Sequence, residues 1–244
     1  MQQFMPLASP NTQRESLPDV MTFRRTWRAY QSRLLSNLDG YLQNRRLHLV
    51  AAPRSGKTVL GLEVIKRVNQ PTLVLAPTIT IRDQWVDRLV DLFLPPGSGR
   101  PAWVSTELRN PSFLTIATYQ ALHAICSGEP EEQTQPTEVD ENGDAEDHVF
   151  DPLSMGADAS RGQGHVLLPE VFTEAKFGAL VLDEAHHLRA EWWKTLTSVA
   201  AELDKPTIIA LTATPPYDVS PFEWQRYEGL CGPVDAEVSV PARR

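Results

Sequence analysis

Three short segments of this chain carry residue types that act on phosphate groups. Gly56-Lys57-Thr58 supplies a flexible turn, a cation and a hydroxyl, and Asp183-Glu184 supplies two neighbouring carboxylates. Thr212-Ala213-Thr214 follows the acidic pair. A loop that binds phosphates, a carboxylate for Mg²⁺ and a second carboxylate for water are what hydrolysis of a nucleoside triphosphate requires. The three segments together therefore predict a site that binds and hydrolyses a nucleotide.

The phosphate-binding loop is predicted from Ser55-Gly56-Lys57-Thr58, which follows an apolar segment and opens a helical one. Backbone N–H groups at the start of a helix point toward phosphate oxygens. We expect Lys57 to reach the β- and γ-phosphates and the Thr58 hydroxyl to bind Mg²⁺. Ala51 replaces the first glycine of the usual Gly-x-x-x-x-Gly-Lys-[Ser/Thr] pattern, but alanine is small enough for the turn. The alternative is a chance Gly-Lys-Thr sequence at an ordinary helix start.

The acidic pair contains two carboxylates that we expect to differ in function. Asp183 is predicted to hold Mg²⁺ through water, and Glu184 is predicted to orient or deprotonate the attacking water. An acidic pair that only complements the dipole of a following helix is the simpler interpretation of these two residues alone. The Lys57 loop upstream favours the catalytic interpretation, in which Lys57, Asp183 and Glu184 are the catalytic residues.

Short apolar segments alternate with segments of helical periodicity along the chain. This alternation is typical of a parallel sheet with helices on both faces, in which ligands bind beyond the carboxyl ends of the strands. All three motifs follow apolar strands directly, so we expect them to meet at one edge of the sheet. The predicted strands are residues 47–50, 71–76, 113–117, 179–182 and 207–211, and the predicted helices are residues 27–38 (ending at Gly40), 59–68, 80–93 and 192–203.

The composition of the chain predicts neither a membrane-spanning nor a disulfide-rich protein, and it marks two segments that differ from the rest. An apolar fraction of 41% is ordinary for a globular protein, and no apolar run is long enough to cross a membrane. Two cysteines, Cys126 and Cys231, predict no disulfide framework and fit a reducing cytoplasm. Residues 1–20 predict a flexible tail, and residues 127–164 predict an acidic disordered insertion.

The acidity of the chain is local. Between Glu129 and Asp158 there are 11 of the 31 Asp and Glu residues and no Lys or Arg, so the rest of the chain, with 23 Lys and Arg, is slightly basic. The net charge of −8 is therefore a poor guide to partners, because local fields decide binding to a phosphate backbone.

The motifs together resemble the first RecA-like domain of superfamily-two helicases and translocases, a group shared with type III restriction subunits and Swi/Snf-type remodellers. Asp183-Glu184-Ala185-His186 is similar to the DEAH form of the second motif of that family. The resemblance runs from about Phe23 to Val240. It implies an α/β RecA-like P-loop NTPase domain over residues 21–244, ATP and Mg²⁺ as cofactors, and movement on a nucleic acid, with DNA favoured over RNA.

The resemblance also assigns residues outside the phosphate loop. Gln31, in a segment similar to the adenine-recognition motif, is expected to bind the adenine edge; the alternative is a solvated helix residue. Trp85 resembles part of a nucleic-acid-facing motif, but the interpretation that we favour is a core residue.

Two further groups of residues are assigned by the same resemblance. Thr78 and Thr118 are expected on the nucleic-acid track, and the alternative is that they only cap helices. His186, Thr212 and Thr214 are expected to couple the state of the nucleotide to that track.

The chain departs from the family pattern in two ways. Arg54 stands where the family usually carries another glycine of the loop. The segment after Thr214 is too short for a second RecA-like domain, whose arginines raise turnover in such enzymes by roughly 10³ to 10⁵. We therefore expect weak ATP binding and little turnover, with the second domain supplied by a longer chain or in trans.

Two other functions remain open from the sequence. One is a duplex-DNA translocase that does not separate strands. The other is a non-catalytic interaction module in which residues 129–158 recruit a basic partner or imitate a nucleic acid.

Overall fold

A computed structural model of the 244-residue chain describes residues 16–128, 172, 175–185, 188, 190–213 and 220–238. Its centre is one seven-stranded sheet, in the order β3-β4-β2-β5-β6-β1-β7, in which every pair of neighbours is parallel. The strands are β1 (Arg46–Ala51), β2 (Thr72–Ala76), β3 (Val104–Ser105), β4 (Leu114–Thr118), β5 (Ala179–Asp183), β6 (Thr207–Thr212) and β7 (Ala236–Val238).

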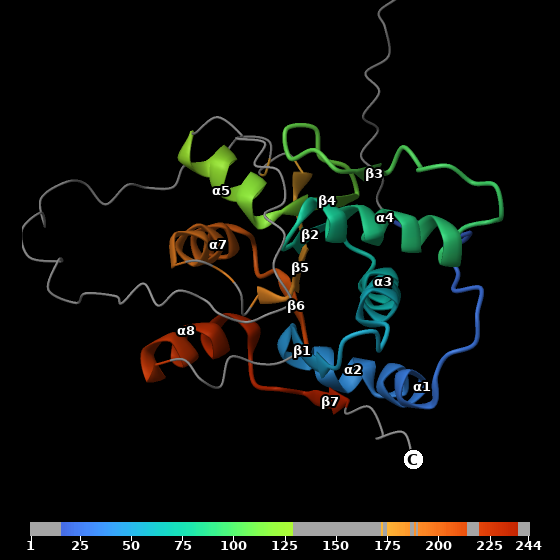
Figure 1. Ribbon diagram of the computed structural model, residues 1–244, viewed down its shortest axis with the longest axis horizontal. Coiled ribbons are helices and arrows are strands. Elements are labelled where there is room, and N and C mark those ends of the chain that lie inside the picture. Colours follow the sequence, from blue (N-terminus) through green and yellow to red (C-terminus); the bar gives the residue numbers. More distant parts are fainter. Residues whose placement is uncertain are drawn as a thin grey trace, which may run out of the picture.

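Helices cover both faces of this sheet (Figure 1). The labelled helices α1 to α4 lie on one side and α5, α7 and α8 on the other. Side chains alternate between two cores: in β2, Val74 packs in the first core, while Leu73 and Leu75 pack in the second. The helical elements are α1 (Ala29–Ser36), α2 (Leu38–Tyr41), the 3₁₀ helix η1 (Leu42–Asn44), α3 (Lys57–Val68), α4 (Ile79–Phe93), α5 (Tyr119–Ser127), α7 (Ala190–Glu202) and α8 (Pro221–Cys231).

The structure confirms the predicted α/β fold and its five apolar strands. It adds β3 and β7, which have two and three residues and are too short for an apolar pattern. It also adds α5 and α8. The amphipathic pattern of α8 is weak, so periodicity alone did not predict this helix, and its apolar Phe222 is 71% exposed.

The predicted helix over residues 27–38 is wrong in its end point. Asn37 leaves the helical conformation, and its amide side chain donates to Arg33 O. Asparagine side chains compete with the helix for backbone groups, so α1 ends here and the short α2 begins. Gly40 lies inside α2 and does not end the helix.

The described residues overlap only part of the predicted tail and insertion. Within residues 1–20, Leu17 is buried, and its N–H donates to Asn69 Oδ1 at 2.7 Å, so packing against the domain starts before residue 20. The insertion predicted at residues 127–164 lies outside the described residues except for Ser127 and Gly128, which end α5. In the described part of the chain, every helix is too short or too polar to span a bilayer.

Candidate active site

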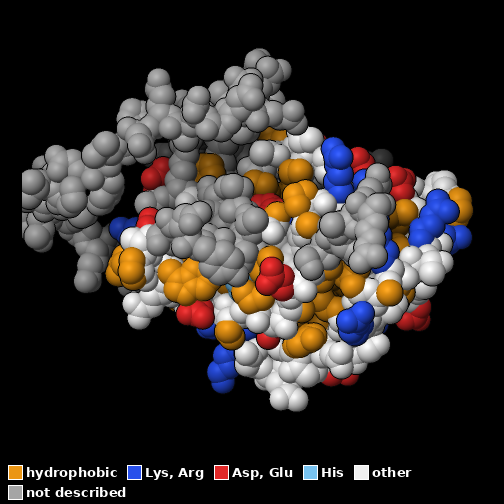
Figure 2. Space-filling view, turned by 60° about the horizontal axis from the view of Figure 1, so that its bottom comes forward, with side chains coloured by type: hydrophobic (Ala, Val, Ile, Leu, Met, Phe, Trp, Pro, Cys, Tyr) orange, Lys and Arg blue, Asp and Glu red, His pale blue; other side chains and the backbone are white. Residues whose placement is uncertain are grey.

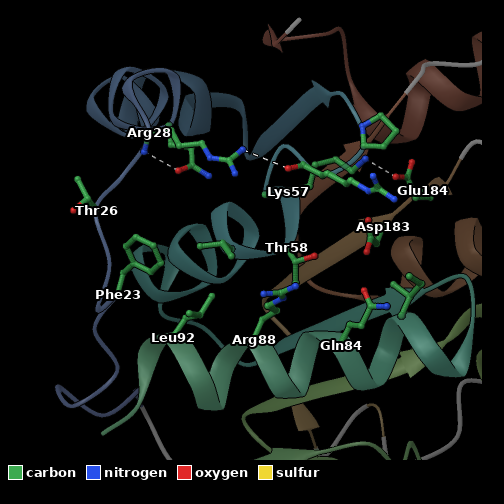
Figure 3. A pocket seen from close by; sticks show the side chains of 16 residues that line it. Phe23, Thr26, Arg28, Lys57, Thr58, Gln84, Arg88, Leu92, Asp183 and Glu184 are labelled. Atoms are coloured by element: carbon green, nitrogen blue, oxygen red, sulfur yellow. Dashed lines mark hydrogen bonds and ion pairs between the residues drawn. The ribbon is translucent and has the colours of Figure 1, made fainter. Parts of the chain in front are cut away.

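A cavity of about 560 Å³ opens between the loop after β1, the helix α4 and the segment before α1 (Figure 3). It brings together residues from four separate stretches of sequence. Six of the predicted site residues line it: Gln31, Gly56, Lys57, Thr58, Asp183 and Glu184.

The loop after β1 has the backbone conformation of a phosphate-binding turn. Gly56 has φ 98° and directly precedes α3, so the turn needs a residue that tolerates the left-handed region. Arg54 has φ 60°, also in that region. A glycine would fit this conformation at position 54 without strain, whereas the arginine adopts it at a cost in backbone strain.

Side chains from the start of α1 hold this loop in place. Arg28 Nη1 donates to Ser55 O at 2.9 Å and to Arg54 O at 3.3 Å, and the Tyr30 hydroxyl also donates to Ser55 O. Gln31 Oε1 accepts from Arg28 N at 3.0 Å, and a Cβ on Gly56 would lie 2.9 Å from Gln31 Nε2. Gln31 is buried, so the alternative of a solvated helix residue is wrong.

Ser55 carries an unsatisfied hydroxyl at the centre of the loop. Its side chain is buried, and its Oγ has no hydrogen-bond partner among the described residues. Buried hydroxyls in folded proteins almost always have a partner. An oxygen-rich anion such as a phosphate supplies one, so the residues present fit the nucleotide that the sequence predicts.

Lys57 and Glu184 form an ion pair across the cavity. Lys57 Nζ lies 2.6 Å from Glu184 Oε1 and donates to Ala51 O at 3.2 Å. The other carboxylate oxygen of Glu184 accepts from Ala213 N at 2.8 Å and from the Thr212 hydroxyl at 3.3 Å. Glu184, at the end of β5, thus contacts both the loop and the predicted coupling segment at the end of β6. The three motifs meet at one edge of the sheet, as the sequence predicts.

Asp183 lies deeper than its neighbour. It is 4% exposed, and its Oδ2 accepts from Trp85 Nε1 at 2.8 Å. Burial raises the pKa of Asp183 to about 6, although the hydrogen bond from Trp85 acts in the opposite direction. Figure 3 shows Asp183 and Thr58 at the same cavity, the positions from which a carboxylate and a hydroxyl would hold a cation beside a phosphate.

One wall of the cavity was missed from the sequence. Four residues of α4 line it at helical spacing, and Gln84 and Arg88 are its two polar members (Figure 3). The adjacent face of α4 carries the buried residues Trp85, Leu89 and Phe93. The amphipathic pattern of this helix places Gln84 and Arg88 away from the core, but only packing shows that they face a cavity. The four are Ile81, Gln84, Arg88 and Leu92.

Thr78 and Thr118 are not among the residues that line this cavity. Thr78 and Thr118 are the N-caps of α4 and α5, and their hydroxyls accept from Ile81 N at 3.2 Å and Ala121 N at 3.1 Å. Their predicted capping is confirmed, and their contact with nucleic acid stays a prediction. His186 and Thr214 lie outside the described residues.

The sequence pattern of the res subunit of type III restriction enzymes matches residues 24–217. The chain belongs to this family. The fold agrees with that assignment, since it has seven parallel strands. The site agrees as well, because the loop, the acidic pair and the Thr212 segment lie at one edge of the sheet. Together with the relatives below, the family identifies a RecA-like ATPase domain of the helicase and translocase type.

Relatives of this type III restriction family domain carry helicase and translocase names. The DNA 3'-5' translocase XPB2 of Sulfurisphaera tokodaii is 24% identical over 200 residues, 82% of this chain and 34% of the relative. A Halobacterium salinarum protein, provisionally named DNA 3'-5' helicase Rad25, is 28% identical over 167 residues, 68% of this chain and 20% of the relative. The chain thus spans about a third or less of the length of these relatives.

Solved structures support the fold of the family domain. The UvsW helicase from bacteriophage T4 has a TM-score of 0.55 at 16% identity, over 86% of this chain and 60% of that one. A hypothetical ATP-dependent RNA helicase from Sulfolobus tokodaii has a TM-score of 0.53 at 15% identity, over 87% and 53% of the two chains. At these identities the likeness shows a shared fold.

Charge is dispersed over the one face of the domain that Figure 2 shows. On the face seen in Figure 2, the Lys and Arg side chains of the described residues lie among acidic and neutral ones. A nucleic-acid track is therefore not marked by charge on this face, and Thr78 and Thr118 remain its predicted positions.

Proposed function

We propose that this chain is the ATP-binding domain of an enzyme that couples ATP hydrolysis to movement on a nucleic acid. The observation that carries the proposal is the arrangement around one cavity of Lys57, Thr58, Asp183 and Glu184. Beside them, the buried hydroxyl of Ser55 has no hydrogen-bond partner in the described part of the chain. A cation, two carboxylates and a hydroxyl next to a left-handed turn at a helix start match the needs of phosphoryl transfer.

Each site residue has a proposed function. Ser55, Gly56 and Lys57 bind the phosphates of ATP, and Gln31 contacts its adenine. Thr58 and Asp183 hold Mg²⁺, which when bound would neutralise charge that develops on the phosphates. Glu184 holds the attacking water and takes its proton. In this structure Lys57 is paired with Glu184, so binding of a phosphate requires Lys57 to exchange that partner.

The nucleic-acid partner is proposed from the family and the strand ends. Thr78 and Thr118 begin helices at the same edge of the sheet as the acidic pair, and helix N-termini favour phosphate groups. His186, Thr212 and Thr214 would carry the state of the nucleotide to that edge. DNA is the favoured substrate, since relatives of the chain are named for action on DNA.

The whole enzyme contains more than this chain in our proposal. A second RecA-like domain, in a longer chain or in trans, would close the cavity and supply arginine side chains, because this chain spans only 34% of the XPB2 translocase. We assign the acidic motif to the DEAH subgroup and the protein to the cytoplasm, where two cysteines need no oxidant.

The test is ATP binding and hydrolysis by the purified chain, with and without single- and double-stranded DNA and RNA. We expect Lys57→Ala to weaken ATP binding at least tenfold and Glu184→Gln to abolish any hydrolysis while ATP still binds. Equal ATP affinity in the wild type and in Lys57→Ala would contradict the proposal.

Translocation on duplex DNA without strand separation is a second candidate. A relative over 82% of this chain is named a DNA translocase and not a helicase. On the longer protein, displacement of a triplex-forming strand without duplex unwinding would favour this candidate, and unwinding of a forked duplex would favour the helicase.

A further inference from the structure

Trp85 lies directly behind the proposed cation site and does not line the cavity. Its side chain has no exposed surface, and its indole N–H donates to Asp183 Oδ2 at 2.8 Å. The two residues are 98 positions apart in the sequence, one in α4 and one at the end of β5. A charge-assisted hydrogen bond in a buried environment is stronger than one at the surface.

The indole itself has little freedom to move. A Cβ on Gly61 in α3 would lie 2.6 Å from Trp85 Cη2 and 2.8 Å from Leu211 Cδ1. The absence of a side chain at Gly61 therefore lets the ring pack directly against α3, with Leu211 of β6 at the same position. A donor fixed in this way gives the carboxylate a defined orientation.

Asp183 is also held from the other face of the sheet. Its backbone carbonyl accepts from the hydroxyl of Tyr119, in α5, at 3.2 Å. Tyr119 has 1% of its surface exposed, so this second contact is buried as well. Tyr119 thus holds the backbone of Asp183, and Trp85 holds its Oδ2. The second carboxylate oxygen of Asp183 is then the one that a cation at the cavity would contact.

We propose that Trp85 is a positioning residue for the divalent cation: it fixes the Asp183 carboxylate in the orientation that binds Mg²⁺ beside Thr58. The inference rests on the proposed function of the site. Partners that hydrogen-bond a metal-binding carboxylate typically change metal affinity by about 10- to 100-fold when they are mutated. Because Thr78 is the N-cap of α4, Trp85 also joins the proposed nucleic-acid track to the cation site through one helix.

The experiment compares Trp85→Phe with Trp193→Phe. Phenylalanine keeps most of the packing at position 85 and removes the donor. Trp193 is a buried tryptophan in the core on the other face of the sheet, where it packs edge-on against Tyr227. Binding of a fluorescent ATP analogue is measured in EDTA and across a Mg²⁺ titration.

We expect the Mg²⁺ concentration at half-effect to rise about tenfold or more in Trp85→Phe and to stay within twofold in Trp193→Phe. Affinity for the analogue in EDTA should stay within twofold of the wild type in both variants. An unchanged Mg²⁺ response in Trp85→Phe overturns the inference. So does an equal loss of affinity with and without Mg²⁺, because that is the result of a merely structural role.

The same titrations separate a failure of the proposed nucleotide site from a failure of the role of Trp85. If the wild type shows no binding that depends on Lys57 and Mg²⁺, the proposed function fails, and the positioning inference fails with it. If the wild type shows such binding and Trp85→Phe responds to Mg²⁺ normally, only the inference on Trp85 fails.

A measurement on the wild type covers the case in which Trp85→Phe does not fold. With Mn²⁺ in place of Mg²⁺ and the analogue bound, the ¹⁵N-indole signal of Trp85 should broaden beyond detection, and that of Trp193 should persist. Retention of the Trp85 signal while backbone signals of Thr58 and Asp183 broaden would overturn the inference.

Discussion

Lys57 Nζ lies 2.6 Å from Glu184 Oε1, so the cation that we expect to bind phosphate is paired with the carboxylate that we expect to activate water. Both side chains are mostly shielded from solvent, with 12% and 21% of their surface exposed. A phosphate and Glu184 would therefore compete for Lys57. Because of this competition, Glu184 should affect nucleotide affinity even where it does not contact the nucleotide.

Glu184→Gln should tighten nucleotide binding while it abolishes hydrolysis. The amide keeps an oxygen that can accept from Ala213 N but loses the charge that holds Lys57. Partly exposed ion pairs contribute up to about 1 kcal/mol, so we expect a two- to fivefold gain in ATP affinity by calorimetry. Phosphate release should fall by about 100-fold or more.

The matched control for that experiment is Glu63→Gln, in α3. Glu63 Oε1 accepts from Arg67 Nε at 3.1 Å, and this ion pair does not line the cavity. The ATP affinity of Glu63→Gln should equal that of the wild type. Weaker ATP binding in Glu184→Gln would contradict the competition between phosphate and carboxylate.

Ser55→Ala should weaken nucleotide binding without loss of stability. The buried Ser55 hydroxyl lacks a partner within the described residues, so its removal should leave the free energy of unfolding unchanged or raise it by up to about 1 kcal/mol. The lost hydrogen bond to phosphate should lower ATP affinity by about two- to tenfold. Urea unfolding and calorimetry measure the two effects.

Thr115→Val is the control, because the hydroxyl of Thr115 is buried but satisfied. It donates to Ser112 O at 3.1 Å and accepts from Ser112 N at 3.0 Å. We expect this variant to lose about 1 kcal/mol of stability. A similar loss of stability in Ser55→Ala would show that Ser55 has a structural partner and is not held for a ligand.

Arg88→Ala should lower nucleotide affinity through the wall formed by α4. The guanidinium lines the same cavity as Lys57 and Thr58, so it adds positive charge where an anion would bind. Hydrogen bonds to charged groups contribute about 1.5–3 kcal/mol, so a loss of about tenfold or more in ATP affinity is expected. Arg82→Ala on the same helix should have no effect, since Arg82 pairs with Asp83 at 2.8 Å outside the cavity. Equal affinities of the two variants would exclude this contribution of Arg88.

Gly61→Ala should destabilise the domain although alanine is the better helix former. The gain in helix propensity is about 1 kcal/mol, but the new Cβ would meet Trp85 and Leu211 at 2.6 and 2.8 Å. Overpacking of a core typically costs about 1–3 kcal/mol, so a net loss of about 1 kcal/mol is expected in urea unfolding. Gly40→Ala in α2, where the added Cβ would meet no described side chain or other segment within 4 Å, should instead raise stability by about 0.5 kcal/mol. A stabilised Gly61→Ala would show that α3 and α4 separate easily.

The stability of the domain should fall as the pH drops below the ordinary histidine value of 6.5 because of His48. Its Nδ1 lies 2.9 Å from Gly232 O, which can only accept, and its Nε2 lies 3.0 Å from the Tyr227 hydroxyl, so the neutral ring satisfies both contacts. Burial lowers the pKa of His48, while Asp235 and Glu228 act in the opposite direction. Below 6.5 the unfolded chain therefore binds a proton that the folded chain excludes, and stability is lost.

His48→Gln tests this origin of the pH dependence. Urea unfolding from pH 8 to pH 5 should show a smaller loss of stability in the variant than in the wild type. The same slope in both proteins would assign the pH dependence to other groups.

Much of the fold was predictable because its signals are local. Apolar runs such as residues 72–76 are buried on both faces of a parallel sheet, so each was recognised without its neighbours. The short strands β3 and β7 pair only because β4 and β1 are already in place. Asn37 divides the first helix through its own side-chain hydrogen bond, which competes with a strong helical pattern.

By itself, the sequence determined the chemistry: the residue types of the loop and the acidic pair, and their meeting at one edge, because parallel strands end on the same side of a sheet. Only the tertiary structure decided which atoms pair. The bond from Trp85 to Asp183, the ion pair of Lys57 and Glu184, and the place of Arg88 in the cavity wall depend on how α3 and α4 are rotated and packed. That rotation is set by close contacts such as Trp85 on Gly61, between groups that no local pattern relates.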